Sequence, residues 1–294
     1  MHGRFTWYEL YTNDTASAKK FYAAVTGWGV QKWDGADAEN PYEMWTARGE
    51  PFAGMMALTD DMKARGVPPH WLAYVKVDSA ADTIAKATSL GAQVVWGPET
   101  VPTVGVLAIF KDPQGAMIAI LQPDSPGDGW DGKPALGKPS WHELLTTDHN
   151  AALKFYNAVF GWTKVSEDDV GGGMKYMTFS SHTGKQPVGG MFTATGPMAN
   201  VPPNWLVYTH HRDAKGAVGA ITRAGGKVIN GPMEVPGGDW IVAFTDPQGA
   251  THALHTAGAK AEAPKPKKKA AKAKAKPKKS KKDKKKDKKK KKKR

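Results

Sequence analysis

Bulky and smaller residues alternate along Phe5–Thr12, and the apolar positions that follow have helical spacing. The period of two predicts a β-strand, and the next pattern predicts a helix capped within residues 12–14 and ended by Gly27. The inward positions of this helix are Ala18, Phe21, Tyr22 and Val25. Further strands are expected near residues 28–33, 42–48 and 52–58. The pattern therefore predicts the order β-α-β-β-β.

The next stretch of chain predicts the same order again. A strand at 71–77 leads into a helix at 79–90 that ends at Gly91. Further strands are expected near residues 92–96, 104–111 and 116–122. The segment Asp112-Pro113-Gln114-Gly115 is typical of a tight turn, because Pro presets φ and Gly accepts a positive φ. We expect this turn to join the last two strands as a hairpin.

The whole pattern occurs twice. The segment WYELYTNDTASAKKFYAAVTGW begins at Trp7, and WHELLTTDHNAALKFYNAVFGW begins 134 residues later at Trp141. The same offset relates PPHWLAY to PPNWLVY and one DPQGA segment to the other, whereas AGM and GGM differ by 136 residues. Each copy should have its own core or share one with its twin. We expect an α+β protein made of a domain at 1–126, a linker at 127–138, a domain at 139–257 and a tail at 258–294.

Composition and charge set the tail apart. The chain has no cysteine, so any metal site would use His, Asp or Glu. Residues 259–294 hold 22 Lys and Arg against 3 Asp and Glu, whereas residues 1–258 carry a net charge of −5. The tail has no aromatic or β-branched residue, and we expect it to be disordered. It should bind nucleic acid or another polyanion without reading sequence; the alternative is a solubilising extension.

The first residues, MHGRFTWYELYTND, contain neither the basic segment nor the apolar segment of a secretion signal. No stretch approaches the roughly 18 to 20 apolar residues of a membrane-spanning helix. We therefore expect a cytoplasmic protein without membrane contact.

The repeated motifs also carry a family resemblance. Two copies of a paired β-α-β-β-β unit, with an E-L-x-T-x-D strand end, an FY helix, a GW turn and a DPQG hairpin, resemble the vicinal oxygen chelate (VOC) superfamily. This family includes glyoxalase I, bleomycin-resistance proteins and extradiol dioxygenases. The resemblance covers about residues 4–122 and 138–256. It implies two tandem VOC domains, each a pair of βαβββ modules with a concave funnel as its site.

The resemblance also implies where a divalent metal would be held, by His, Gln or Glu from the first, fifth and eighth strands of a domain. In this chain those positions carry Trp7, Leu72 and Ala119 in copy one and Trp141, Leu206 and Ala253 in copy two. A shift of one residue on the fifth strand would substitute Trp71 and Trp205. None of these side chains offers a metal ligand. We therefore expect neither the family metal nor another cofactor.

Glu9 and Glu143 are the candidate catalytic or anchoring residues. Each lies two residues after the position that the resemblance assigns to the first-strand metal ligand. Strand alternation therefore places it on the same side of the strand, which in this family faces the funnel. A desolvated carboxyl group there would have a raised pKa and could act as a base or accept a hydrogen bond from a ligand; the alternative is a structural hydrogen bond. The candidate ligand-binding aromatics are Trp7, Trp71, Tyr74, Trp141, Trp205 and Tyr208. The alternative role for these aromatics is core packing.

Copy two alone has histidines that permit a metal alternative. If alternation holds, His210 and His255 share the concave side with Glu143 and form a set of two histidines and one carboxylate. The histidines that would face the other way are His142, His211 and His252.

The sequence thus favours a metal-independent, glyoxalase/bleomycin-resistance-like protein that binds a small aromatic or amphipathic molecule, anchored by Glu9 and Glu143. Two alternatives stay open. One is a metal-dependent lyase, isomerase or dioxygenase with its site in copy two, and the other is a nucleic-acid-associated scaffold. The sequence does not decide whether the protein is an enzyme, nor whether it also forms a homodimer.

Overall fold

The computed structural model describes residues 2–35, 42–125, 135–181 and 186–258. The chain up to Ala259 forms one compact unit. The predicted disordered tail and most of the predicted linker lie outside the described residues. Among the described helices, none is long and apolar enough to cross a membrane.

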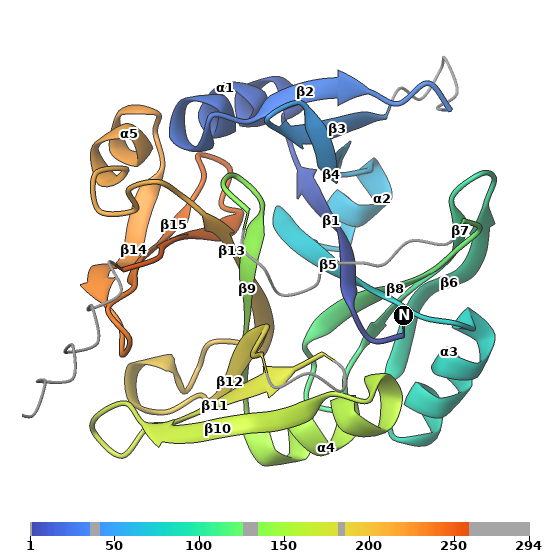
Figure 1. Cartoon of the computed structure of the whole chain (residues 1–294). Helices are drawn as coiled ribbons and strands as arrows, with labels where there is room; N and C mark the ends of the chain where they lie inside the picture. Colours follow the sequence, from blue (N-terminus) through green and yellow to red (C-terminus); the bar gives the residue numbers. More distant parts are fainter. Residues whose placement is uncertain (1, 36–41, 126–134, 182–185, 259–294) are drawn as a thin grey trace, which may run out of the picture. The chain divides into compact units, whose positions relative to one another are not determined.

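Each copy consists of two β-α-β-β-β modules, as predicted (Figure 1). Copy one contains β1 (Phe5–Thr12), α1 (Thr15–Thr26), β2 (Gly29–Lys32), β3 (Glu43–Ala47), β4 (Glu50–Ala57), α2 (Asp60–Ala64), β5 (His70–Lys76), α3 (Ala80–Ser89), β6 (Gln93–Val101), β7 (Gly105–Lys111) and β8 (Met117–Pro123). Copy two contains β9 (Pro139–Thr146), α4 (His149–Phe160), β10 (Thr163–Asp169), β11 (Lys175–Ser180), β12 (Gly189–Thr193), the 3-10 helix η1 (Gly196–Met198), β13 (Asn204–His210), α5 (Val218–Arg223), β14 (Lys227–Glu234), β15 (Trp240–Thr245) and β16 (Thr251–Thr256). The short helix α2 has no counterpart in the predicted elements.

The helix boundaries follow from local chemistry. Asp14 caps α1 by accepting a 3.0 Å hydrogen bond from the Ser17 N–H, and Gly27 ends the helix with a φ of 73°. Asp148 caps α4 in the same way, and Gly161 ends it with a φ of 74°. The cap and stop predicted for the first helix are confirmed.

Each copy forms one eight-stranded sheet, and its two modules join in the middle by antiparallel pairing of their first strands, β1 with β5 and β9 with β13. The order in copy one is β2-β3-β4-β1-β5-β8-β7-β6, and copy two repeats it as β10-β11-β12-β9-β13-β16-β15-β14. Strand β1 runs parallel to β4, and β5 runs parallel to β8. The pairing brings the first, fifth and eighth strands of a domain together at the centre of its sheet.

The two copies share one hydrophobic core, which we call the shared core. It contains Trp45 and Tyr22 from copy one and Trp162 and Tyr156 from copy two, all fully buried. Helix α1 packs against α5 of the other copy, and α3 packs against α4 (Figure 1). Of the two arrangements expected from the repeat, the structure therefore has the shared core.

Hydrogen bonds made by the repeated motifs cross between the copies inside this core. Asp112, in the β7–β8 turn, accepts a 2.9 Å hydrogen bond from the Tyr156 hydroxyl, which in turn accepts one of 3.1 Å from the Trp205 indole. The reverse connection joins Asp246 to Tyr22 at 3.4 Å, and Trp71 donates to Tyr22 at 2.8 Å. The DPQG, FY and PPxW motifs are thus parts of one reciprocal link between the copies.

The glutamine of each DPQG turn extends the same link to a helix start. The Gln114 side chain accepts a hydrogen bond from the Asp148 N–H at 2.6 Å and donates to the Asp148 carbonyl at 2.8 Å. Gln248 makes the equivalent pair with the backbone of Asp14, at 2.5 and 2.7 Å. Each DPQG turn therefore binds the backbone at the N-terminus of the first helix in the other copy, α4 or α1.

Replacing Tyr156 by Phe should destabilise the protein. The change leaves the buried Asp112 carboxyl and the Trp205 indole N–H without this shared partner, which costs about 1–3 kcal/mol of unfolding free energy. Equilibrium unfolding in urea measures the loss. Tyr22→Phe is the matched comparison and should cost a similar amount, because its longer bond to Asp246, at 3.4 Å, is offset by a shorter bond from the Trp71 indole, at 2.8 Å. Equal stability of Tyr156→Phe and the unmodified protein would show that the link contributes nothing.

Candidate functional site

The face of each sheet that is turned away from the shared core carries a second, smaller apolar cluster. In copy one this inner cluster contains Tyr11, Leu72, Tyr74 and Ala119, with Trp7 packed against it. Cross-strand pairs confirm that these residues share a face, because Trp7 lies opposite Tyr74, and Tyr74 lies opposite Ala119. Copy two has the equivalent inner cluster of Tyr208, Ala243 and Ala253, with Trp141, Leu206 and Ile241 against it.

Glu9 lies in the inner cluster of copy one, opposite Leu72 on the neighbouring strand. Its side chain is buried, with 4% of the residue exposed. The Tyr42 hydroxyl donates to Glu9 Oε2 at 2.9 Å and itself accepts a 3.1 Å hydrogen bond from the Trp7 indole. Glu9 Oε1 is buried and has no hydrogen-bond partner among the described residues.

Glu143 has equivalent surroundings in copy two, but it accepts one more hydrogen bond than Glu9 does. The Tyr176 hydroxyl donates to Glu143 Oε2 at 2.9 Å, and Tyr176 accepts a 2.8 Å hydrogen bond from the Trp141 indole. The Tyr208 hydroxyl donates to Glu143 Oε1, also at 2.9 Å. Both carboxyl oxygens of Glu143 are therefore bonded, and the residue is only partly buried.

A glycine on the adjacent parallel strand makes room for each of these tyrosines. Gly54 pairs with Glu9, and a Cβ atom there would lie 1.7 Å from the Tyr42 hydroxyl oxygen. Gly190 pairs with Glu143, and its Cβ would lie 2.2 Å from the hydroxyl oxygen of Tyr176. The glycine shared by the AGM and GGM motifs is thus required by the close approach of a tyrosine to a buried carboxyl group.

Burial governs the ionisation of both glutamates. Desolvation raises the pKa of Glu9 to about 8, and the hydrogen bond from Tyr42 opposes this shift. Desolvation also raises the pKa of Glu143, opposed by the hydrogen bonds from Tyr208 and Tyr176. Glu9 can therefore exchange a proton close to neutral pH, which is the property of an acid or base and of a group that can both donate and accept hydrogen bonds.

The strand positions where the resemblance implied metal ligands lie together in the inner clusters. They carry Trp7, Leu72 and Ala119 in copy one and Trp141, Leu206 and Ala253 in copy two. Leu72, and not Trp71, faces the inner cluster, which resolves the register on the fifth strand. Indole, isobutyl and methyl groups hold no metal ligand atom, so the residues present do not fit a divalent metal at this position.

The remaining candidate aromatics are divided between the two faces. Trp7, Trp141, Tyr74 and Tyr208 lie with the glutamates, as described above. Trp71 and Trp205 point the other way, into the shared core, where their indoles bond to Tyr22 and Tyr156. The structure therefore places these two tryptophans away from Glu9 and Glu143, in the core-packing position that strand alternation permits.

The histidines of copy two do not gather around Glu143. His210 and His255 are neighbours across β13 and β16, with ring centroids 5.8 Å apart. His255 bonds to Asp239 at 2.8 Å and to Ser140 at 3.1 Å, while Glu143 bonds to tyrosines. Within the described ranges, no three His, Asp or Glu side chains form a group suited to a metal ion. His142 and His252 are buried on the opposite face, as alternation predicted.

Tyr42 and Tyr176 are the site residues that the sequence reasoning missed. They are separated by 134 residues, the offset of the duplication, and that repetition was the available signal. Hydrophobic periodicity alone does not distinguish them from other aromatics on the sheet. Their role depends on contact with β1 and β9, far from them in sequence.

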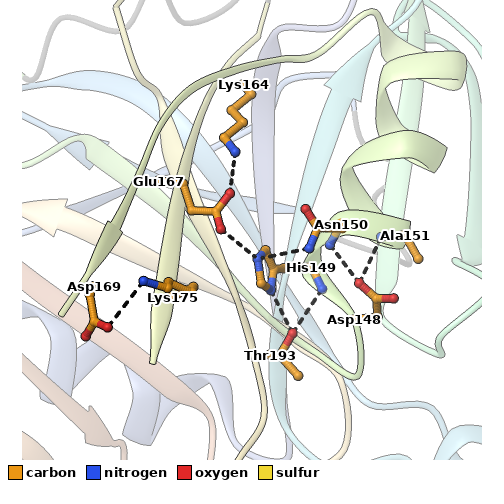
Figure 2. A network of polar contacts seen from close by, with 9 residues as sticks. All are labelled: Asp148, His149, Asn150, Ala151, Lys164, Glu167, Asp169, Lys175 and Thr193. Atoms are coloured by element: carbon orange, nitrogen blue, oxygen red, sulfur yellow. Dashed lines mark hydrogen bonds and ion pairs between the residues drawn. The ribbon is translucent and has the colours of Figure 1, made fainter. Parts of the chain in front are cut away.

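A separate polar network lies at the start of α4 (Figure 2). His149 Nδ1 bonds to the Thr193 hydroxyl at 2.7 Å, and the Asp148 carboxylate accepts hydrogen bonds from the helix N-terminus. Glu167 forms an ion pair with Lys164 beside it. A cavity of about 310 Å³ opens nearby between α4 and β10, and neither Glu9 nor Glu143 lines it. This network caps the helix and is distinct from the glutamate sites.

Comparison with known proteins identifies the family. The model of the Glyoxalase/Bleomycin resistance protein/Dioxygenase superfamily matches residues 4–120 and 138–254, one domain in each copy. The chain belongs to this superfamily and contains two tandem VOC domains, so the fold and family expected from the sequence are confirmed.

Relatives match nearly the whole chain apart from the tail. A Mycobacterium tuberculosis protein named as a candidate glyoxylase, CFP32, is 32% identical over 252 residues, which cover 86% of this chain and 94% of that protein. The anthracycline biosynthesis protein DnrV of Streptomyces peucetius is 28% identical, over 84% of this chain and 91% of that protein.

Solved structures show the same fold. The Mn(II)-bound glyoxalase from Novosphingobium aromaticivorans aligns with a TM-score of 0.56 at 18% identity, covering 87% of this chain and 82% of that one. Homoprotocatechuate 2,3-dioxygenase from Brevibacterium fuscum aligns with a TM-score of 0.59 at 15% identity, covering 89% and 82%.

Replacing Glu9 by Gln should remove a pH dependence of stability. The pKa of Glu9 is about 8 in the folded protein and 4.5 for an unperturbed glutamate. Between these pH values the folded state keeps the Glu9 proton and the unfolded state releases it. The stabilising contribution of Glu9 protonation to the free energy of unfolding is therefore complete below pH 4.5 and is lost as the pH rises to 8. The slope is at most about 1.4 kcal/mol per pH unit.

Urea unfolding at several pH values measures this slope. Glu9→Gln should show a flatter decline than the unmodified protein between pH 5 and pH 8, by the loss of about one titrating group. Glu50→Gln serves as a control, because the pKa of the exposed Glu50 is lowered by Lys138 and its titration lies below this window. Parallel curves for Glu9→Gln and the unmodified protein would contradict the assigned pKa.

Proposed function

We propose that this protein is a metal-independent VOC protein that binds a small aromatic or amphipathic molecule in the inner clusters, with Glu9 and Glu143 as polar anchors. The observation that carries the proposal is the repeated arrangement of a carboxyl group, a tyrosine and a tryptophan on the inner face of each sheet. Small-molecule sites are mostly apolar with a few directed polar groups, and each inner cluster has this composition.

The family positions for metal ligands support binding without a metal. Trp7 and Trp141 replace the first-strand ligand in the two copies, and each supports the tyrosine that bonds to the nearby glutamate. A flat indole and a polarised carboxyl group favour a ligand with an aromatic body and a polar substituent. The name of DnrV, which refers to anthracycline biosynthesis, is in keeping with an aromatic ligand class, because anthracyclines contain fused aromatic rings.

The short helix α2 lies against the inner cluster of copy one. In copy one, Met62 on α2 and Val67 just after it pack against the inner cluster. The rest of α2 is exposed, and its ion pairs, such as Lys63 with Asp60, are of the weak surface kind. We infer that a ligand reaches Glu9 by displacing this short helix, which is held by few buried contacts.

Binding of 2-naphthol, a simple aromatic hydroxyl compound, tests the proposal. Titration calorimetry should give saturable binding, and dialysis against EDTA should leave the affinity unchanged within about twofold. The double variant Trp7→Ala/Trp141→Ala removes the indole from both inner clusters and should weaken binding by about tenfold or more. Circular dichroism checks that the variant is folded. Unchanged affinity in the folded double variant would remove the inner clusters as the site, and loss of binding on chelation would restore a metal-dependent reading.

We also propose that the basic tail attaches the protein to nucleic acid or another polyanion. The support is its 22 Lys and Arg within residues 259–294, against a net charge of −5 in the rest of the chain. Such binding releases counterions and is therefore strongly weakened by salt.

Deletion of residues 259–294 should abolish binding to a short DNA duplex and its salt dependence. Fluorescence anisotropy at several NaCl concentrations measures both quantities. A variant of the same length with Gln in place of the tail Lys and Arg controls for chain length and should behave like the deletion, because the charge is what releases counterions. Full DNA affinity in the tailless protein would refute the role of the tail and favour the folded domains as the nucleic-acid-binding part.

A further inference from the structure

The two glutamate sites differ by one hydrogen bond. Tyr208 completes the bonding of Glu143, whereas the equivalent Tyr74 does not donate to Glu9. Instead, the Tyr74 hydroxyl forms a hydrogen bond with the Tyr11 hydroxyl. Glu9 Oε1 is therefore a buried polar atom without a partner in the described parts of the chain, on a residue that is 4% exposed.

Two substitutions between the copies accompany this difference. The position equivalent to Tyr11 in copy two is Leu145, which has no polar atom to attract a tyrosine hydroxyl. Tyr11 is also held in place, because its ring stacks on His70 with centroids 5.1 Å apart and an interplanar angle of 13°. The residue equivalent to His70 is Asn204, so copy two has neither the hydroxyl nor the stacking ring.

We propose that the two domains have different roles: domain 1 binds the ligand, and Glu9 Oε1 receives a hydroxyl or amino group carried by an otherwise apolar, aromatic molecule. In domain 2, Glu143 is a fully bonded structural group. This inference rests on the proposed function and narrows it to one copy and one class of ligand. Tyr11 is the specificity-determining residue, because it keeps Tyr74 away from the position that the ligand takes.

The energetics favour this assignment. A buried hydrogen-bonding atom without a partner is costly, and a ligand donor that reaches it recovers that cost. Because the pKa of Glu9 is about 8, its carboxyl group can take either protonation state near neutral pH. The ionised group accepts a hydrogen bond from a ligand hydroxyl, and the protonated group donates one to a ligand acceptor atom. The neighbouring side chains Leu72, Ile109 and Ala119 are apolar, so the rest of the ligand must be apolar as well.

Exchange of the residue at this position tests the inference. Tyr11→Leu gives domain 1 the leucine that domain 2 has at this position, so Tyr74 should turn to Glu9 and close the site. The double variant Tyr11→Leu/Tyr74→Phe removes that new donor and should reopen the site. Leu145→Tyr makes the opposite change in domain 2 and should withdraw Tyr208 from Glu143.

Titration calorimetry with 2-naphthol should give one site per chain in the unmodified protein. Tyr11→Leu should weaken binding by about tenfold or more, the double variant should regain affinity, and Leu145→Tyr should add a second site. The matched probe 2-methoxynaphthalene has the same rings but no hydrogen-bond donor. Above pH 8, where Glu9 is ionised and only accepts hydrogen bonds, this probe should bind the unmodified protein about tenfold more weakly than 2-naphthol.

A measurement without ligand checks the structural step. Carbon-13 NMR of glutamate-labelled protein reports the pKa of Glu9, with Glu9→Gln used for assignment. Tyr11→Leu should lower this pKa, because a new hydroxyl donor stabilises the ionised carboxylate, and the double variant should restore it. Tyr74→Phe alone should leave the pKa of Glu9 unchanged, whereas Tyr208→Phe should raise that of Glu143.

The outcomes separate this inference from the proposed function. If Trp7→Ala/Trp141→Ala abolishes 2-naphthol binding but Tyr11→Leu does not affect it, the inner clusters bind ligand and the division of roles is wrong. Two bound molecules per unmodified chain, or equal affinity for the two probes, would also overturn the inference. Absence of any 2-naphthol binding would overturn both proposals for aromatic hydroxyl ligands.

Discussion

The structure depends on the reciprocal hydrogen bonds from a turn aspartate of one copy to a helix tyrosine of the other. Asp112 with Tyr156, and Asp246 with Tyr22, connect the DPQG turn to the FY helix across the shared core. These bonds fix which face of each sheet is covered by the partner copy. Because side chains alternate along a strand, the same constraint decides which residues face the other side. The glutamate sites are thus a consequence of how the copies pair.

Much of this could be predicted from the sequence because it is local or repeated. Alternation along the sequence predicted strand β1. The start and end of α1 could be predicted from the capping residues near Asp14 and from Gly27. The offset of 134 residues between the repeats predicted two similar domains. The inward direction of Glu9 followed from alternation together with the family resemblance, which identified that side of the strand as the funnel. Helix α2 was not predicted, since five residues with exposed side chains leave almost no hydrophobic pattern.

The parts that could not be predicted depend on contacts distant in sequence. Alternation assigns Trp71 to one face or the other only when the register is known, and it cannot tell which face the second copy will cover. The role of Tyr42 could not be predicted, because it depends on the pairing of β3 with β4 and of β4 with β1. This pairing places the Tyr42 hydroxyl next to Gly54 and within hydrogen-bond distance of Glu9. His255 follows the predicted strand, yet Asp239 and Ser140 hold it in bonds that no spacing rule indicates.

Duplication explains how a costly group can persist in such a protein. A buried carboxyl group with one unbonded oxygen lowers stability, as Glu9 does, and a single-domain protein would bear that cost in its only core. Here the shared core and the reciprocal turn bonds support both domains together, and domain 2 keeps a fully bonded version of the same site. Stability supplied by the common core therefore permits one copy to diverge. In the division of roles that we propose, the presence of Tyr11 in place of the equivalent Leu145 separates the ligand-binding Glu9 from the structural Glu143.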